Sequence, residues 1–332
     1  MASFRRNIAL DSTKGLAILM VIITHFEWTT AERQALLFPF WISMAVPLFM
    51  LVTGYVTAAS YDRKGITSLR AMYQPRLLWR KFGVYTIPFA CMYAIQILAE
   101  ALNGTPLSLS DIVKRAVLGG VGGFGTYYYP FLIQLLFLLP LIYVTVTRVK
   151  KGLLICFLIN VLYEVLQSAF SLSGAVYRIL VLRYLFAVAV GCYLFTLREK
   201  PRHLGKAAIV AALGAGFIFL VSYTAYEPVV FTRWTNTSLL TVLYAAPAVY
   251  AALTRTPPLG CNALAFLGKR SYHIFLVQIL YYRYVAPLLN FPAPYRYVSM
   301  ALGVVICVVA GCGFYALYTA SASWGRNTFY SK

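Results

Sequence analysis

The chain has 332 residues, of which 61% are hydrophobic and only 11% are charged. A soluble globular domain carries about 25% charged residues, so this composition excludes an ordinary soluble protein. The formal net charge of +20 would suggest a nucleic-acid partner in a soluble protein, but here the positions of the basic residues are better explained by membrane topology, and no nucleic-acid role is predicted.

The first apolar segment carries polar residues at both of its ends. Asp11 and Lys14 adjoin a run that starts at Gly15 and includes His25. On a helix, the eleven positions from Lys14 to His25 correspond to about 16 Å along the axis and a rotation of only about 20°. Asp11 falls within about 40° of His25 on the same stripe. An ionisable residue in a membrane segment predicts a functional site, the alternative being a histidine satisfied by backbone or headgroups near the helix end.

Ten apolar segments approach the roughly 20 residues that a helix needs to cross a bilayer. We predict spans at about residues 10–28, 38–59, 78–101, 127–147, 152–170, 178–197, 206–225, 237–253, 264–287 and 298–320. The predicted fold class is therefore all-α, a polytopic membrane protein with ten transmembrane helices. A single domain is expected over residues 1–332.

The basic residues alternate along the chain in step with these spans. Of the 29 Lys and Arg, 21 fall in the N-terminal segment and every second connection after it, and eight fall on the other side. Lys and Arg are enriched in cytoplasmic loops of membrane proteins. This bias predicts that both termini are cytoplasmic, with Lys14 at the cytoplasmic end of the first helix and His25 toward its outer half.

A second basic cluster precedes the third predicted span. Arg76 and Arg80 are four residues apart, so they share one face of a helix. Arginine guanidinium groups suit the recognition of phosphate. The alternative is ordinary anchoring at the cytoplasmic surface and attraction to anionic lipids.

The glycine-rich run before the fourth span contains a literal GxGxxG from Gly120 to Gly125. A dinucleotide fingerprint needs a strand before it and a soluble helix after it, and this run has neither. We interpret it as a flexible outer loop. The tyrosines that follow, through Tyr129, are typical of an interfacial aromatic belt or of a surface that stacks on carbohydrate.

The spacing of the cysteines and histidines indicates neither a metal site nor a set of disulfides. The six cysteines are scattered, mostly inside apolar runs, without a CxxC or a Cys/His cluster at metal-ligand spacing. We predict neither a metal site nor a disulfide framework. Among polar residues of the later spans, Arg183, Ser271, Tyr272 and Gln278 are each, taken alone, more typical of a structural role.

Several stretches follow the order of the motifs of one known family. A basic residue, ten positions and a histidine run from Lys14 to His25. The other similar stretches are Pro47–Tyr55, the Arg76 and Arg80 pair, Tyr129–Leu132 and Leu267–Gln278. Together they resemble the membrane acyltransferase-3 family from the first helix to the ninth. Two positions depart from the family pattern: Lys14 stands where arginine is commoner, and Gln278 stands where a histidine is usual.

The resemblance implies transfer of an acyl group, usually acetyl, from coenzyme A to a hydroxyl of a cell-surface or lipid-linked glycan. It assigns His25 as the general base, with a covalent acyl-histidine as the alternative route. Lys14, Arg76 and Arg80 would hold the phosphates of acyl-CoA. Supporting or substrate-binding roles fall to Asp11, Tyr129, Arg183, Ser271, Tyr272 and Gln278.

The expected enzyme is thus an O-acyltransferase in the inner or plasma membrane. Its partners would be acyl-CoA as donor substrate, a glycan acceptor and the bilayer, with no permanently bound cofactor, and a homo-oligomer is left open. The alternative function is a transporter or export component for a polysaccharide or small molecule, which would use the polar stripe as a pathway.

Overall fold

The computed structural model describes residues 7–121, 124–198, 203–226, 239–254, 261–289, 291 and 293–330. These residues are predominantly helical and contain no strand, which confirms the all-α class for the described part of the chain. The loop residues Arg5, Arg6, Lys200, Arg202, Arg233, Arg255 and Lys332, which enter the charge count above, lie outside the described residues.

The α-helices differ widely in length, from a single turn to 35 residues. They are α1 (Ile8–Thr24), α2 (Thr30–Ala35), α3 (Ala45–Arg63), α4 (Leu69–Met72), α5 (Pro75–Leu102), α6 (Leu109–Val117), α7 (Tyr128–Arg148), α8 (Gly152–Ala169), α9 (Gly174–Ile179), α10 (Leu185–Thr196), α11 (Leu204–Tyr223), α12 (Val242–Thr254), α13 (Cys261–Leu280) and α14 (Arg296–Tyr330). Short 3₁₀ turns occur at Phe38–Phe40, Ile42–Met44, Val181–Tyr184, Leu239–Thr241, Ala286–Leu288 and Ala293–Tyr295, and a π-helical segment at Tyr281–Val285.

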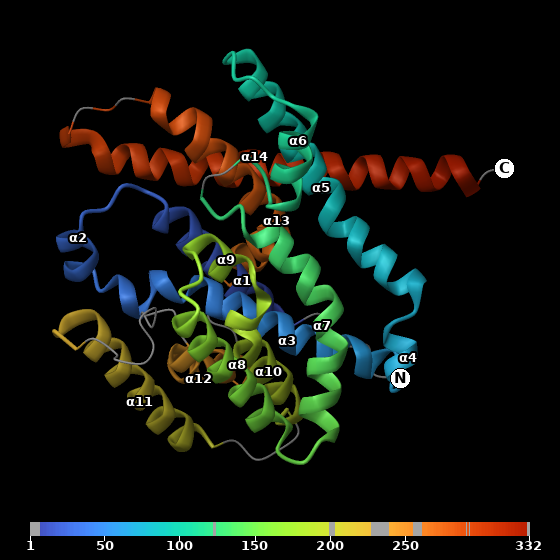
Figure 1. Ribbon diagram of the computed structural model, residues 1–332, viewed down its shortest axis with the longest axis vertical. Coiled ribbons are helices and arrows are strands. Elements are labelled where there is room, and N and C mark those ends of the chain that lie inside the picture. Colours follow the sequence, from blue (N-terminus) through green and yellow to red (C-terminus); the bar gives the residue numbers. More distant parts are fainter. Residues whose placement is uncertain are drawn as a thin grey trace.

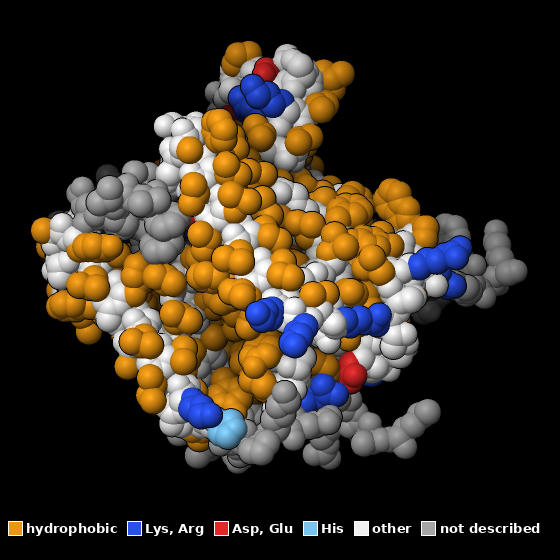
Figure 2. Space-filling view, turned by 60° about the horizontal axis from the view of Figure 1, so that its bottom comes forward, with side chains coloured by type: hydrophobic (Ala, Val, Ile, Leu, Met, Phe, Trp, Pro, Cys, Tyr) orange, Lys and Arg blue, Asp and Glu red, His pale blue; other side chains and the backbone are white. Residues whose placement is uncertain are grey.

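Each of the ten predicted spans coincides with one of these helical segments. Six segments are long and apolar enough to cross a membrane: Phe38–Arg63, Leu69–Leu102, Tyr128–Arg148, Gly152–Ala169, Leu204–Tyr223 and Arg296–Ser321. Figure 2 shows one broadly hydrophobic face with most of its visible Lys and Arg side chains in the lower half of the view. The chain is therefore a multi-pass membrane protein, while the count of ten spans and the orientation of the termini stay predictions.

Helix α1 lies at the centre of the arrangement, packed against both α3 and α13 (Figure 1). Its contact with α13 depends on two glycines. A Cβ on Gly15 would lie 1.9 Å from the backbone oxygen of Leu264, and one on Gly268 would lie 1.8 Å from that of Asp11. Small residues at such crossings let the backbones of two membrane helices come into contact. In lipid the hydrophobic effect does not drive helices together, so this close packing stabilises the pair instead.

Helices α3 and α10 meet in the same way. A Cβ on Gly54 would lie 2.1 Å from the oxygen of Val188, and one on Gly191 would lie 2.1 Å from that of Leu51. In both pairs the helices run in the same direction, as the first and ninth, or second and sixth, of the predicted spans would. These two close crossings set the distance between α1 and α13 and between α3 and α10.

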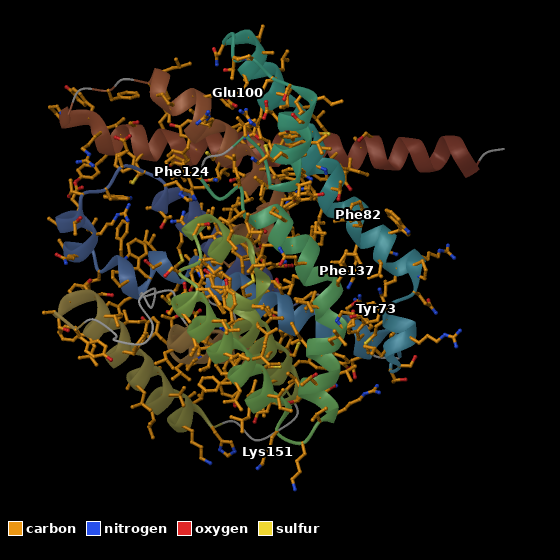
Figure 3. All side chains as sticks on the ribbon, in the orientation of Figure 1. Tyr73, Phe82, Glu100, Phe124, Phe137 and Lys151 are labelled. Carbon is orange, nitrogen blue, oxygen red and sulfur yellow. The ribbon has the colours of Figure 1, made fainter. Side chains whose placement is uncertain are left out.

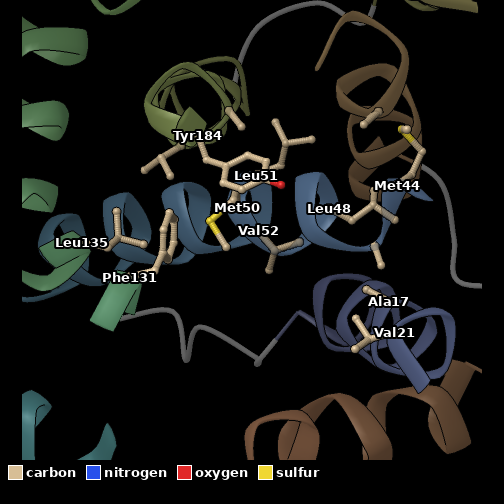
Figure 4. Close-up of a cluster of buried hydrophobic side chains, with 14 of the residues drawn as sticks. Ala17, Val21, Met44, Leu48, Met50, Leu51, Val52, Phe131, Leu135 and Tyr184 are labelled. Atoms are coloured by element: carbon tan, nitrogen blue, oxygen red, sulfur yellow. The ribbon is translucent and has the colours of Figure 1, made fainter. Parts of the chain in front are cut away.

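The buried core lies where α1, α3, α7 and the start of α10 converge (Figure 4). Ile18, Ile22 and Leu51 are fully buried there. The labelled side chains in the close-up are Ala17, Val21, Met44, Leu48, Met50, Leu51, Val52, Phe131, Leu135 and Tyr184. This core holds one side of α1, and α13 holds the other.

Replacing Gly15 by alanine should destabilise the folded protein. The new methyl group would overlap the α13 backbone, which cannot move as a side-chain tip can, and overpacking of this kind costs about 1–3 kcal/mol. The measurement is the thermal unfolding midpoint in detergent. Gly216→Ala on α11 is the matched control, because nothing lies within 4 Å of its Cβ position. Equal midpoints for the two variants would contradict the close-crossing account.

Candidate active site

A cavity of about 630 Å³ lies beside α1 and is bounded by α3, α5, α7 and α13. Lys14 and His25, the two ends of the predicted polar stripe, both line it. Three further predicted residues line the same cavity: Arg183, Ser271 and Tyr272. The structure thus brings together residues from the beginning, middle and end of the chain, and we call the two regions of this cavity its Lys14 end and its His25 end.

The position of His25 is set by where α1 stops. The helix ends at Thr24 and His25 is its C-terminal cap, so His25 lies just past the helix rather than inside it. Carbonyl groups in the last turn of a helix lack partners within the helix. Here the backbone N–H groups of His25 and Phe26 bond to the oxygens of Ile22 and Ile23, each at 3.2 Å. Two side chains add a second donor: the Trp28 indole donates to the oxygen of Ile23 at 2.8 Å, and the Tyr282 hydroxyl donates to that of Ile22 at 2.8 Å.

Aromatic rings surround the half-buried imidazole of His25. Its ring centroid lies 5.0 Å from that of Phe124 and 6.0 Å from that of Tyr282. Tyr282 belongs to the π-helical segment that follows α13, and π-segments frequently occur at functional sites because they turn a side chain out of the regular helical register. This turn carries Tyr282 to the end of α1.

His25 also lines a second cavity, of about 360 Å³, together with Phe124 and Tyr282. Glu27, Tyr281 and Arg296 contribute to the lining of this second cavity. His25 therefore lies at the junction of the two cavities, and the larger cavity extends along α1 to Lys14. A side chain at such a junction can act on two molecules that approach from different sides.

The Lys14 end carries a charged pair. Lys14 Nζ lies 2.7 Å from a carboxylate oxygen of Asp11, which is buried while Lys14 remains partly exposed. Lys269 of α13 lines the cavity as well. Asp11 is thus close enough to position Lys14. It lies in the first turn of α1, at the opposite end of the helix from His25.

The remaining predicted residues lie outside the cavity lining. Arg76 and Arg80 are exposed near the start of α5, while Val84 and Tyr85, farther along that helix, line the cavity. Arg80 is about 6 Å and Arg76 about 12 Å before Val84 by helical rise. Their predicted phosphate contacts stay a prediction, at the edge of the cavity rather than within it.

Tyr129 and Gln278 are engaged with the protein itself. The Tyr129 ring stacks on Phe89 with centroids 3.7 Å apart, and its hydroxyl lies 3.1 Å from that of Thr86. Gln278 is buried and its Nε2 donates to the backbone oxygen of Phe124 at 3.1 Å. Gln278 therefore contributes to the site indirectly, by holding the residue that contacts His25.

The glycine-rich run before α7 makes specific contacts in its described part, Gly122 and Gly123 lying outside it. The backbone N–H of Val121 donates to Oε1 of Gln96 at 3.2 Å. A Cβ on Gly120 would lie 2.6 Å from that same oxygen, and φ there is +127°. Buried glutamines on α5 and α13 thus bond to this run at Val121 and at Phe124. Figure 3 marks Phe124, whose ring contacts His25.

Three residues near His25 were not predicted from the sequence: Arg33, Phe124 and Tyr282. Arg33 on α2 lines the main cavity and lies close enough to act electrostatically on His25. Phe124 and Tyr282 stood in aromatic-rich stretches with no feature to single them out. The one available signal was charge, because Arg33 is among the few basic residues on the predicted outer side.

The comparison with known families decides what kind of protein this is. The family profile described as an acyltransferase domain matches residues 7–317, which is nearly the whole chain. The chain belongs to the acyltransferase-3 family. Membership in this family makes it a membrane acyltransferase. No curated protein and no solved structure gives a significant match.

In this acyltransferase, α2 is tied to the start of α14 beside the second cavity. The Glu32 carboxylate accepts a hydrogen bond from the Tyr297 hydroxyl at 2.6 Å and pairs with Arg296 at 3.1 Å. The Tyr297 hydrogen bond, followed by those from Thr29, lowers the pKa of Glu32 from about 4.5 to about 2. Glu32 also closes a capping box with Thr29 that begins α2.

The Glu32 contacts should stabilise the protein in a pH-dependent way. Because the folded-state pKa is lowered, the stabilisation is fully present above about pH 4.5 and is lost as the pH falls toward 2. Glu32→Gln should therefore lower the unfolding midpoint at pH 7, and its difference from the parent should shrink below pH 4.5. The neighbouring Glu27→Gln is the control, and an equal loss in that variant would argue against the assignment.

Proposed function

We propose that this protein is an O-acyltransferase that moves an acyl group, acetyl in the simplest case, from coenzyme A to a hydroxyl of a cell-surface or lipid-linked glycan. The observation that carries the proposal is the single cavity lined by Lys14 and His25, with His25 also lining a second cavity. We place the enzyme in the inner or plasma membrane with ten spans and both termini cytoplasmic. Donor and acceptor would then approach His25 from opposite sides.

The donor side is supported by the charges at the Lys14 end. Lys14 and Lys269 line the cavity there, and Arg76 and Arg80 lie nearer the start of α5, toward the predicted cytoplasmic surface. Phosphate groups of acyl-CoA pair well with such cations. The nucleotide part would stay at this basic mouth, while the narrow pantetheine arm follows α1 for the roughly 16 Å to His25.

The chemistry assigned to His25 is general-base catalysis. Neutral imidazole takes the proton from the acceptor hydroxyl as its oxygen attacks the thioester carbonyl carbon. Collapse of the tetrahedral intermediate breaks the carbon–sulfur bond, and the imidazolium returns the proton to the departing CoA sulfur. The products are the glycan ester and free CoA. An acyl-histidine intermediate is the alternative route and uses the same residue.

His25→Ala should lower turnover by about 10²–10⁴-fold, the usual contribution of a general base. Radiolabelled acetyl-CoA incubated with membranes should label a glycan fraction with the parent protein and not with the variant. The unfolding midpoint serves as the folding control, since His25 follows the last turn of α1. Transfer at the parent rate by a folded variant would refute the mechanism, and absence of labelling with the parent protein would favour a transport function.

Lys14→Met should raise KM for acetyl-CoA by about 10–100-fold with a smaller effect on kcat, because one charge-assisted contact contributes about 1.5–3 kcal/mol. Since the variant would leave the buried Asp11 carboxylate without its 2.7 Å partner, Asp11→Asn/Lys14→Met tests the same loss without a stranded charge. The exposed Lys206→Met on α11 is the control. An unchanged KM in both Lys14 variants would remove Lys14 from the donor site.

A further inference from the structure

The charges that line the main cavity are of one sign. Five lining residues carry permanent or near-permanent positive charge: Lys14, Arg33, Arg178, Arg183 and Lys269. Among the described lining residues there is no Asp or Glu. Converging like charges repel one another, and a bound anion relieves that repulsion. Lys14 is paired with Asp11 from outside the lining, but the surface that the cavity presents to a ligand is positively charged and is suited to anions.

Three of these cations lie at the His25 end. Arg33 acts electrostatically on His25, as noted above. Arg178 and Arg183 flank a short segment that Gln134 in α7 holds by two hydrogen bonds, to the oxygen of Ile179 at 2.9 Å and from the N–H of Val181 at 3.3 Å. Arg183 lies within electrostatic reach of Tyr127, which lines the same cavity and follows Phe124 by three residues, so the segment that carries the two arginines lies toward the end of the cavity where His25 lies.

Arg183 is held in a defined position. Its guanidinium carbon lies 4.8 Å from the ring centroid of Tyr177 and 4.9 Å from that of Tyr184. The Tyr177 hydroxyl in turn donates to the buried carboxylate of Glu164, with oxygen–oxygen distances of 3.0 and 3.1 Å. Glu164 thus holds Tyr177, one of the two tyrosines that contact Arg183. Arg183 itself lines the cavity, whereas Glu164 does not.

Membrane topology does not account for these arginines. Arg33, Arg178 and Arg183 belong to the minority of eight basic residues on the predicted outer side, where the positive-inside rule disfavours them. Two others of the eight, Arg283 and Arg296, form salt bridges with Glu100 and Glu32. Arg33, Arg178 and Arg183 instead line the cavity that His25 also lines, where Arg183 packs against Tyr177 and Tyr184.

We infer that the His25 end of the cavity selects an anionic acceptor, in which a carboxylate or phosphate group binds Arg33, Arg178 and Arg183 while a nearby hydroxyl faces His25. The inference rests on the proposed function and names its substrate class. The CoA phosphates are assigned to the Lys14 end, about 16 Å away along α1, so they do not account for cations at this end. The anion is carried either by an acidic sugar or by the pyrophosphate of a lipid-linked glycan.

The experiment compares matched acceptors with the purified full-length protein and radiolabelled acetyl-CoA. The first pair is a hexuronic-acid oligosaccharide and its carboxyl-reduced neutral counterpart. The second pair is a neutral oligosaccharide carried on a polyprenyl pyrophosphate and the same oligosaccharide released from it. The parent protein should favour the charged member of one pair by about tenfold or more in kcat/KM, and the pair that responds identifies the source of the anion.

Variants then locate the recognition. Arg33→Gln and Arg178→Gln, at exposed positions on the rim, should each reduce this preference while leaving KM for acetyl-CoA unchanged. Arg183→Lys, which keeps the charge but not the planar fork, should reduce it as well. The exposed Lys114→Gln on α6, outside the cavity lining, is the control and should keep the full preference.

The outcomes separate this inference from the function on which it rests. Equal acylation of charged and neutral members of both pairs would overturn the anionic acceptor while leaving acyl transfer in place. Arginine variants that change only the preference between succinyl-CoA and acetyl-CoA would also overturn the anionic acceptor, because the arginines would then bind the acyl group of the donor. If the parent protein acylates no acceptor, the proposed function itself fails, and the inference fails with it.

Discussion

The backbone contact between α1 and α13 is the constraint on which the rest of the structure depends. Gly15 and Gly268 face each other's helices with no room for a side chain, so the two helices touch along their main chains. In a bilayer, apolar surface alone does not draw helices together, and such close packing is what fixes their positions. The contact places Lys14 beside the α13 residues Lys269 and Ser271 in the cavity lining, and it sets the path that α13 follows toward His25.

The far end of the same helix pair illustrates a second constraint, the need to satisfy backbone groups away from water. α1 must stop before His25 if the imidazole is to stand between two cavities, and its last carbonyls then need donors. The backbone N–H groups of His25 and Phe26 supply one set of donors, and Trp28 from the following turn and Tyr282 from the π-helical segment add a second. The Tyr282 side chain thereby both bonds to the end of α1 and contacts His25. The same residue therefore stabilises the helix end and forms part of the surroundings of the imidazole.

Much of this arrangement could be predicted from the sequence, for physical reasons that differ from residue to residue. Hydropathy located the ten long or apolar helical segments because lipid imposes a nearly uniform apolar pattern, whereas the short helices α2, α4 and α6 lie between the predicted spans. The spacing from Lys14 to His25 placed both on one cavity because a single helix carries them. Arg33, Phe124 and Tyr282 could not be found in this way, since their approach to His25 depends on tertiary packing between distant segments. Tyr129 and Gln278 matched sequence motifs but lie outside the cavity lining, where they stack on Phe89 and hold Phe124.

The loop that carries Phe124 shows how buried polar residues serve a membrane enzyme without touching its substrates. Gln96 and Gln278 are both fully buried, and among the described residues Gln96 Nε2 and Gln278 Oε1 have no hydrogen-bond partner, so each side chain uses its other amide atom. Each bonds to the backbone of the glycine-rich loop, one on either side of Gly122 and Gly123. The glycines allow the chain to pass close to these amides at positive φ, and the amides fix where the loop presents Phe124. The ring of Phe124 then contacts both His25 and Tyr282 at the junction of the two cavities. Although the composition of this loop indicates flexibility, side chains on two other helices bond to its described residues Val121 and Phe124 at the junction.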